Sequence, residues 1–166
     1  MENSWEDERP RLSVVRTQPT LPKHRQRHLI LSVDDEPGLL YTREKILECE
    51  GYEVLSAADG EKGLELLGTY AVDLVLLDYK MPGMDGGTVA TEMKRRIPMV
   101  PVIMVSGNHV PAETLEVVDC FILKGEGPEL LLAAIHQLLV TMTDTRTKNS
   151  SPGRKPTDNT GGAQPG

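Results

Sequence analysis

Residues 72–78 read Val-Asp-Leu-Val-Leu-Leu-Asp, a short and mostly apolar run that closes on Asp78. A second run of this kind, Leu-Ile-Leu-Ser-Val at 29–33, is followed directly by Asp34 and Asp35. Such runs are typical of strands that are buried on both faces of a parallel sheet. Neighbouring parallel strands lie roughly 5 Å apart, so acids at their ends repel one another unless a cation neutralises them. The sequence therefore predicts a site for a hard metal ion.

Strands and helices alternate along the middle of the chain. Gly and Pro separate the segments, Gly51 ends the first helix, and Thr88 is the expected cap of the third helix. This order predicts an α/β fold with a doubly wound, five-stranded parallel sheet, right-handed crossovers and helices on both faces. We expect strands at 29–33, 52–56, 72–77, 100–105 and 120–123, and helices at 37–50, 60–69, 88–97, 112–118 and from Pro128 onward.

Polar side chains recur where the predicted strands end. In sheets of this kind ligands bind outside the carboxyl ends of the strands, where the strand order changes direction. Each such residue alone has a structural explanation, because Asp caps helices, Ser is common in loops and Lys is usually solvated. Their occurrence together on one rim favours a functional site, made of Asp34, Asp35, Asp78, Ser106 and Lys124.

The length of 166 residues suits a single domain with tails. Residues 1–27 mix prolines with charges and show no sustained period, and residues 143–166 consist mostly of Thr, Lys, Asn, Ser, Pro and Gly. Segments of this composition bury too little apolar surface to offset their ordering entropy. We therefore expect a folded domain over 28–142 between two disordered tails.

The net charge of -7 is concentrated in the predicted domain, where residues 29–142 carry 19 Asp plus Glu against 8 Lys plus Arg. An acidic surface gains nothing from a phosphate backbone, so direct nucleic-acid binding by this domain is not expected. No apolar stretch approaches the roughly 20 residues of a membrane span, and the first residues contain no apolar signal segment. We expect a cytoplasmic protein without membrane contact.

Four stretches together resemble the receiver domain of two-component response regulators. They are Asp-Asp-Glu at 34–36, Leu-Asp-Tyr-Lys-Met-Pro-Gly-Met-Asp-Gly at 77–86, Val-Ser-Gly at 105–107 and Phe-Ile-Leu-Lys at 121–124. The resemblance covers about residues 29–140. It implies a flavodoxin-like sheet and a stand-alone signalling domain that is not an enzyme, although such a domain assists its own phosphorylation and dephosphorylation.

The same resemblance implies a role for each acid. Asp78 is the expected phosphoacceptor, which becomes 4-aspartylphosphate by attack on a phosphohistidine or a small acyl phosphate. Asp35, Asp78 and the backbone carbonyl of Lys80 are the expected Mg²⁺ ligands, and Asp34 would act mainly through a water molecule. Mg²⁺ suits this set because it binds one or two carboxylates together with phosphate oxygens.

The remaining residues of the resemblance concern the phosphoryl group and the signal. Lys124 would hold one phosphoryl oxygen and the Ser106 hydroxyl another. Phe121 occupies the position of the family's switch aromatic, although the position suits a plain core residue equally well. The implied partners are a histidine kinase or phosphotransfer protein, which supplies the phosphoryl group, and an unidentified downstream protein, which reads a population shift.

The chain departs from the family pattern near Lys124. Gly125 stands where the family usually has proline, and glycine loosens the backbone there. Lys124 follows Ser106 by 18 residues, about one helical turn fewer than expected, which predicts a shortened or partly unwound fourth helix. Lys80 and Asn108 stand where the family tunes the lifetime of the phosphoryl group, and we hypothesise that Lys80 shields or pairs with it.

Two other functions are compatible with the fold. The first is a receiver-like scaffold without phosphorylation, which binds a partner through the altered face of the fourth helix and fifth strand. A scaffold has no physical need for mutually repelling acids, which argues against it. The second is a phosphatase-type hydrolase, but this would want a second acid two residues after the nucleophile, where Lys80 stands.

Overall fold

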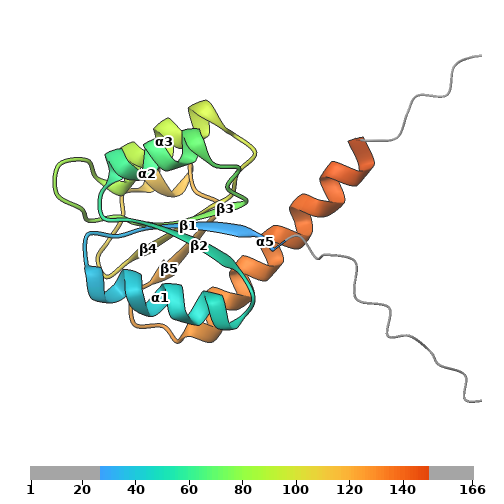
Figure 1. Ribbon diagram of the computed structural model, residues 1–166. Coiled ribbons are helices and arrows are strands. Elements are labelled where there is room, and N and C mark those ends of the chain that lie inside the picture. The colour runs from blue at the N-terminus through green and yellow to red at the C-terminus, as the bar shows by residue number, and fades with distance from the viewer. Residues whose placement is uncertain (1–26, 150–166) are drawn as a thin grey trace, which may run out of the picture.

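The structure is a computed structural model that describes residues 27–149. Its sheet has five parallel strands in the order β2-β1-β3-β4-β5, with helices on both faces (Figure 1), so the predicted fold is confirmed. The predicted tails lie outside the described residues, except for Arg27 and 143–149. The elements are β1 (Leu29–Val33), α1 (Pro37–Cys49), β2 (Glu53–Ala57), α2 (Gly60–Thr69), β3 (Leu74–Asp78), α3 (Gly86–Arg96), β4 (Val102–Ser106), α4 (Ala112–Leu115), β5 (Cys120–Leu123) and α5 (Pro128–Asn149).

The sheet separates two hydrophobic cores. Because successive side chains of a strand point to opposite faces, Leu31 and Val33 face one core while Ile30 faces the other. The first core is completed by α2 and α3, and the second by α1 and α5, in agreement with the two layers of helices in Figure 1. The alternation of side chains along a strand thus determines which pair of helices a residue at the strand end faces.

The helix and strand boundaries differ from the sequence prediction in a few places. β3 and β4 begin two residues later than expected and include Asp78 and Ser106 as their last residues. The prediction that Thr88 caps the third helix is wrong. The Asp85 carboxylate caps α3 by accepting a hydrogen bond of 2.8 Å from the Thr88 backbone N–H. A carboxylate also interacts favourably with the positive end of the helix dipole.

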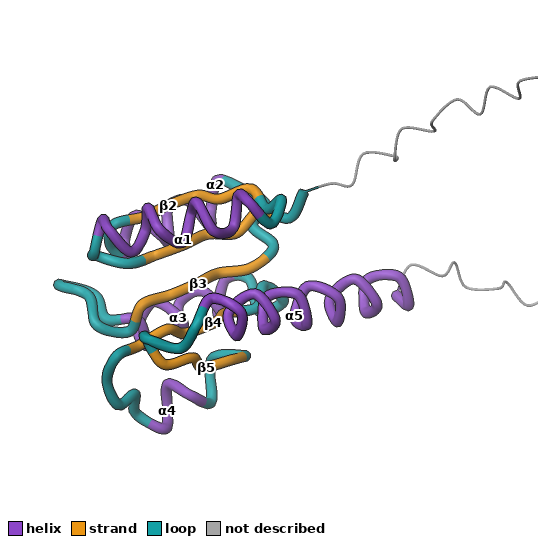
Figure 2. The backbone as a smooth tube through the Cα atoms, turned by 90° about the horizontal axis from the view of Figure 1, so that it is seen from below, coloured by secondary structure: helices purple, strands orange, loops and turns teal. Residues whose placement is uncertain are grey.

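The last two helices depart from ordinary lengths in opposite directions. α4 spans only Ala112–Leu115, so the predicted shortening is confirmed. α5 runs on to Asn149, past the predicted domain end at Met142. Adding residues to a formed helix is easier than starting one, so the packed first half of α5 allows polar residues to continue it. Figures 1 and 2 show the end of α5 extending beyond the sheet.

Within the part of the chain that the structure describes, no helix combines the length and apolar character that crossing a membrane requires.

Candidate metal and phosphoryl site

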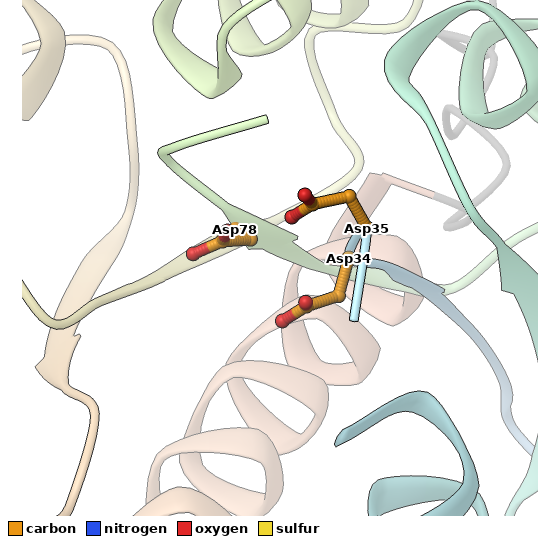
Figure 3. Close-up of side chains that lie close together, drawn as sticks. All are labelled: Asp34, Asp35 and Asp78. Carbon is orange, nitrogen blue, oxygen red and sulfur yellow. The ribbon is translucent and has the colours of Figure 1, made fainter. Parts of the chain in front are cut away.

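The three acids meet where the strand order changes direction. From β1 the chain passes to β2 on one side and then to β3 on the other, and Val33 lies beside Leu77 in the β1–β3 register. Asp34 and Asp78 are therefore neighbours at the carboxyl ends of these strands. Figure 3 shows the side chains of Asp34, Asp35 and Asp78 gathered there, and each offers a carboxylate oxygen within 4.8 Å of the others.

The Asp34 carboxylate is fully buried and both of its oxygens are engaged. Oδ1 accepts a hydrogen bond of 3.0 Å from the Glu36 backbone N–H. Oδ2 lies 3.0 Å from Nη1 of Arg43 and 3.2 Å from Nζ of Lys124. This acid is thus held by positive groups from α1 and from the end of β5.

Lys124 joins the two buried acids. Its Nζ lies 3.1 Å from Oδ1 of Asp78 as well as 3.2 Å from Oδ2 of Asp34. Asp34, Asp78 and Lys124 lie at even spacing along the chain from Ile30, Leu76 and Ile122, which all belong to the core beneath α1 and α5. Strand periodicity therefore directs these side chains to the same face.

Burial and charge act in opposite directions on this pair. Burial raises the pKa of Asp78 and the repulsion of Asp34 adds to it, while the contact with Lys124 lowers it; the net shift is upward. For Lys124, burial lowers the pKa, but its contacts with Asp78 and Asp34 outweigh this effect and the pKa is raised. The Lys124 side chain is therefore protonated and positively charged at neutral pH.

Asp35 completes a set of oxygen ligands. It is partly buried, and in Figure 3 its carboxylate extends toward Asp78 while that of Asp34 leaves the strand end in another direction. Among residues 27–149 we find no hydrogen bond or ion pair to the Asp35 carboxylate, in contrast to Asp34. Oxygen ligands in this arrangement fit Mg²⁺, with Asp35 and Asp78 as the carboxylates best able to bind it directly.

The loop after Asp78 is held tightly against the end of β3. The Gly86 backbone N–H donates a hydrogen bond of 2.8 Å to the Tyr79 carbonyl. A Cβ atom at position 86 would overlap the Asp78 carbonyl oxygen, so only glycine allows this approach. Lys80 lies exposed within the loop, and the role of its backbone carbonyl as a metal ligand stays a prediction.

Ser106 ends β4 and Phe121 is the second residue of the neighbouring strand β5, and neither joins the ion pairs. The Ser106 hydroxyl donates to the Asn108 carbonyl and accepts from the Asn108 N–H, both at 3.1 Å, which forms a small turn. Phe121 is partly buried and packs against the core beneath α2 and α3. Met81, in the loop after Asp78, belongs to the same core.

Arg43 is the site residue that sequence reasoning missed. It is buried, although its chemistry suits a helix surface. The available signal was helical spacing, because Leu40 and Leu47 lie three residues before and four residues after Arg43 and are buried on the same side of α1. A charged residue at such a position requires a partner of opposite charge, and here that partner is Asp34.

Comparison with known proteins decides the family. The family model of the response regulator receiver domain matches residues 30–136. The chain belongs to this family. The receiver domain is the signalling module of two-component systems, and its fold is the one described above.

Several relatives support this assignment. The transcriptional regulatory protein GlrR of Escherichia coli is 36% identical over 140 residues, which cover 80% of this chain but only 31% of GlrR. A CheY-like receiver domain protein from Methanospirillum hungatei is 31% identical with a TM-score of 0.68, covering 72% of this chain and 98% of that one.

A third relative has been solved in informative states. The response regulator TrrA of Thermotoga maritima, in complex with Mg²⁺ and BeF, is 29% identical with a TM-score of 0.65, covering 67% of this chain and 98% of TrrA. TrrA has also been solved in complex with the histidine kinase ThkA.

Proposed function

We propose that this receiver accepts a phosphoryl group on Asp78 in a Mg²⁺-dependent reaction and passes the signal to a partner protein by a conformational change. The observation that carries the proposal is Lys124, whose ammonium group lies between the buried carboxylates of Asp34 and Asp78 beside a third acid. A phosphoryl group on Asp78 would bring its oxygens next to this cation. A plain scaffold would not need that arrangement, and a phosphatase-type hydrolase would want a second acid where Lys80 stands.

In the proposed reaction an oxygen of the Asp78 carboxylate attacks the phosphorus of a phosphohistidine or an acyl phosphate. The new O–P bond forms as the P–N bond, or the P–O bond of the acyl phosphate, breaks. The imidazole leaves with a proton, or the carboxylate of the acyl group leaves. A carboxylate is a weak nucleophile, so positioning and charge neutralisation must supply most of the catalysis.

Lys124 supplies one part of that neutralisation. Its Nζ is already 3.1 Å from Oδ1 of Asp78, so little rearrangement is required for it to pair with a phosphoryl oxygen. Asp35, Asp78 and the Lys80 carbonyl would hold Mg²⁺, which would supply further positive charge beside the acceptor carboxylate. Asp34 would contribute mainly through water, because Arg43, Lys124 and the Glu36 N–H engage both of its oxygens.

The output would begin at Ser106. Among the described residues its hydroxyl bonds only to the Asn108 backbone, and a phosphoryl oxygen offers a stronger, charged acceptor. If the hydroxyl turns toward that oxygen, the turn at Asn108 loosens and Phe121 can move into the space. A change of a few kcal/mol in relative stability makes a minor state dominant.

The proposed phosphodonor is a histidine kinase or a phosphotransfer protein in the cytoplasm. The solved complex of TrrA with the histidine kinase ThkA supports a partner of this class. The chain spans about a third of GlrR, whose name describes a transcriptional regulatory protein. The downstream partner of this chain is therefore proposed only as a protein.

The test is to incubate the full chain with Mg²⁺ and acetyl phosphate and to measure its intact mass. We expect a phosphorylated species that is absent from Asp78→Asn and from samples without Mg²⁺. Asp59→Asn is the matched control, because Asp59 caps α2 by accepting from the Lys62 N–H and asparagine caps equally well. Unmodified protein throughout, with no spectral response to beryllofluoride, would favour the scaffold.

A further inference from the structure

Arg43 places a second positive group, besides Lys124, inside the acidic site. It lies on α1, and only 8% of its surface is exposed. Its Nη1 is 3.0 Å from Oδ2 of Asp34, the oxygen that also contacts Lys124. The three carboxylates of the site therefore face two cations of the protein itself.

The contact between Arg43 and Asp34 is close but does not have the geometry of a hydrogen bond. Within the described residues neither Nη1 of Arg43 nor Oδ2 of Asp34 has a hydrogen-bond partner, and both atoms are buried. Their attraction is therefore mainly between the charges, and it is little screened at this depth. Leaving either charge buried alone would be strongly unfavourable.

Packing alone does not account for an arginine at this position. Leu40 and Leu47 occupy the same buried side of α1, and a leucine or methionine at position 43 would continue that apolar stripe. An arginine must be desolvated to fit there, and this is tolerable only because Asp34 is at hand. The arginine at position 43 is therefore explained by its charge interaction with Asp34 and not by packing in the core.

Resting on the proposed magnesium-dependent function, we propose that Arg43 is an internal counter-ion that weakens Mg²⁺ binding and stabilises the metal-free site. A positive charge next to Asp34 opposes a second cation arriving at the neighbouring acids. It also fixes the Asp34 carboxylate between α1 and β5, away from Asp35. Arg43 is a positioning residue in this role, because it contacts an acid and not the reacting atoms.

The experiment measures Mg²⁺ affinity directly by calorimetry on the unphosphorylated full chain. We expect Arg43→Met, which keeps much of the side-chain length without the charge, to bind Mg²⁺ about tenfold more tightly, since removing a nearby like charge favours the ion. Arg43→Lys keeps the charge and should stay within about twofold of the unsubstituted protein. The control is Arg96→Met on α3, where Arg96 pairs with Glu92 at the surface.

Melting curves at several Mg²⁺ concentrations give a second measurement. Without Mg²⁺, Arg43→Met should melt at a lower temperature than the unsubstituted protein. Its melting temperature should rise more when Mg²⁺ is added, because at a given concentration a more tightly bound ligand stabilises the folded state more. Arg43→Gln serves the same purpose if Arg43→Met does not fold. Equal or weaker Mg²⁺ affinity in the neutral variants overturns the proposal.

The two proposals fail in different ways. If no protein in the series binds Mg²⁺, the proposed metal-dependent function is wrong. If all of them bind Mg²⁺ equally, the function stands and only the role of Arg43 is lost. A lower melting temperature without a change in affinity would show that Arg43 supports the fold alone.

Discussion

The two halves of the site are built differently. At the β1–β3 ends two of the three acids are held by ion pairs, with Lys124 bridging Asp34 and Asp78 at 3.2 and 3.1 Å. In the β4–β5 half Ser106, at the end of β4, bonds to its own loop, and the half-buried Phe121 within β5 packs against the core. The helix that joins these last two strands is only four residues long.

This difference separates chemistry from output. The groups that would accept and neutralise a phosphoryl group are in place before it arrives, which is the preorganisation that catalysis requires. The groups that would report it make few specific contacts and can change them at low free energy. We therefore expect substitutions at the acid half to affect phosphorylation more than substitutions at the β4–β5 half.

The largest effect should come from Lys124→Met. Removing a charge-stabilising group from a preorganised site typically slows a reaction by about 100-fold, and we expect that loss in the rate of phosphorylation by acetyl phosphate. The control is Lys62→Met, whose lysine pairs with Glu65 on the surface of α2. If Lys124→Met were phosphorylated within twofold of the rate of the unsubstituted protein, the groups at the β1–β3 ends would not be preorganised for the reaction.

Gly86→Ala tests the backbone beneath the acceptor. Its Cβ would overlap the Asp78 carbonyl oxygen, so we expect the free energy of unfolding to fall by about 2 kcal/mol, in the range of strained or overpacked sites. Gly68→Ala in α2 meets no atom within 4 Å, and should raise stability by up to about 1 kcal/mol through helix propensity. Denaturant titration distinguishes the two, and similar losses in both would contradict a specific contact at Gly86.

The buried charge of Asp78 should make stability depend on pH. Burial raises its pKa above the ordinary value of 3.8, so the folded state holds the proton more tightly than the unfolded state. The ionised form thus opposes folding above the raised pKa, and this penalty disappears as pH falls toward the ordinary value. Without Mg²⁺, Asp78→Asn should melt higher than the unsubstituted protein at pH 7, and the difference should shrink in acid. If the difference in melting temperature grew as the pH fell, the ionised form of Asp78 would not oppose folding and the prediction would be wrong.

The smallest effect concerns the corner after Lys124. Gly125 has a φ of +105°, where an L-residue is strained, so Gly125→Ala should lower stability by about 1 kcal/mol. Gly51→Ala is the matched control, because Gly51 has a φ of +87° between α1 and β2. Both should lose similar stability, but only Gly125→Ala should also slow phosphorylation, by displacing Lys124. Equal rates would show that this corner is independent of the acids.

Much of this architecture could be predicted from the sequence because its signals are local. Apolar runs of strand length and alternating helices predicted the sheet, and acids directly after two of those runs predicted the gathering of Asp34, Asp35 and Asp78. The short interval between Ser106 and Lys124 predicted the shortened α4. These inferences need only the strand period, the parallel connections and the chain length.

The cap of α3 and the end of α5 could not be predicted from the sequence, because neither has a local signal that decides it. Both Asp85 and Thr88 are plausible caps, and only the path of the chain out of the Asp78 loop decides for Asp85. The polar end of α5 has no local signal for a helix, but it extends a helix that packing had already formed.

The sequence by itself determined the fold, the acidic rim and the membership of the receiver family, because period, spacing and motif act over short stretches of chain. Only the tertiary structure decided that Arg43 is buried against Asp34, that Lys124 bridges two acids, and that Ser106 is engaged with its own loop. Those contacts join residues that are distant in sequence or that choose among several partners, and their energies depend on burial, which no local pattern contains.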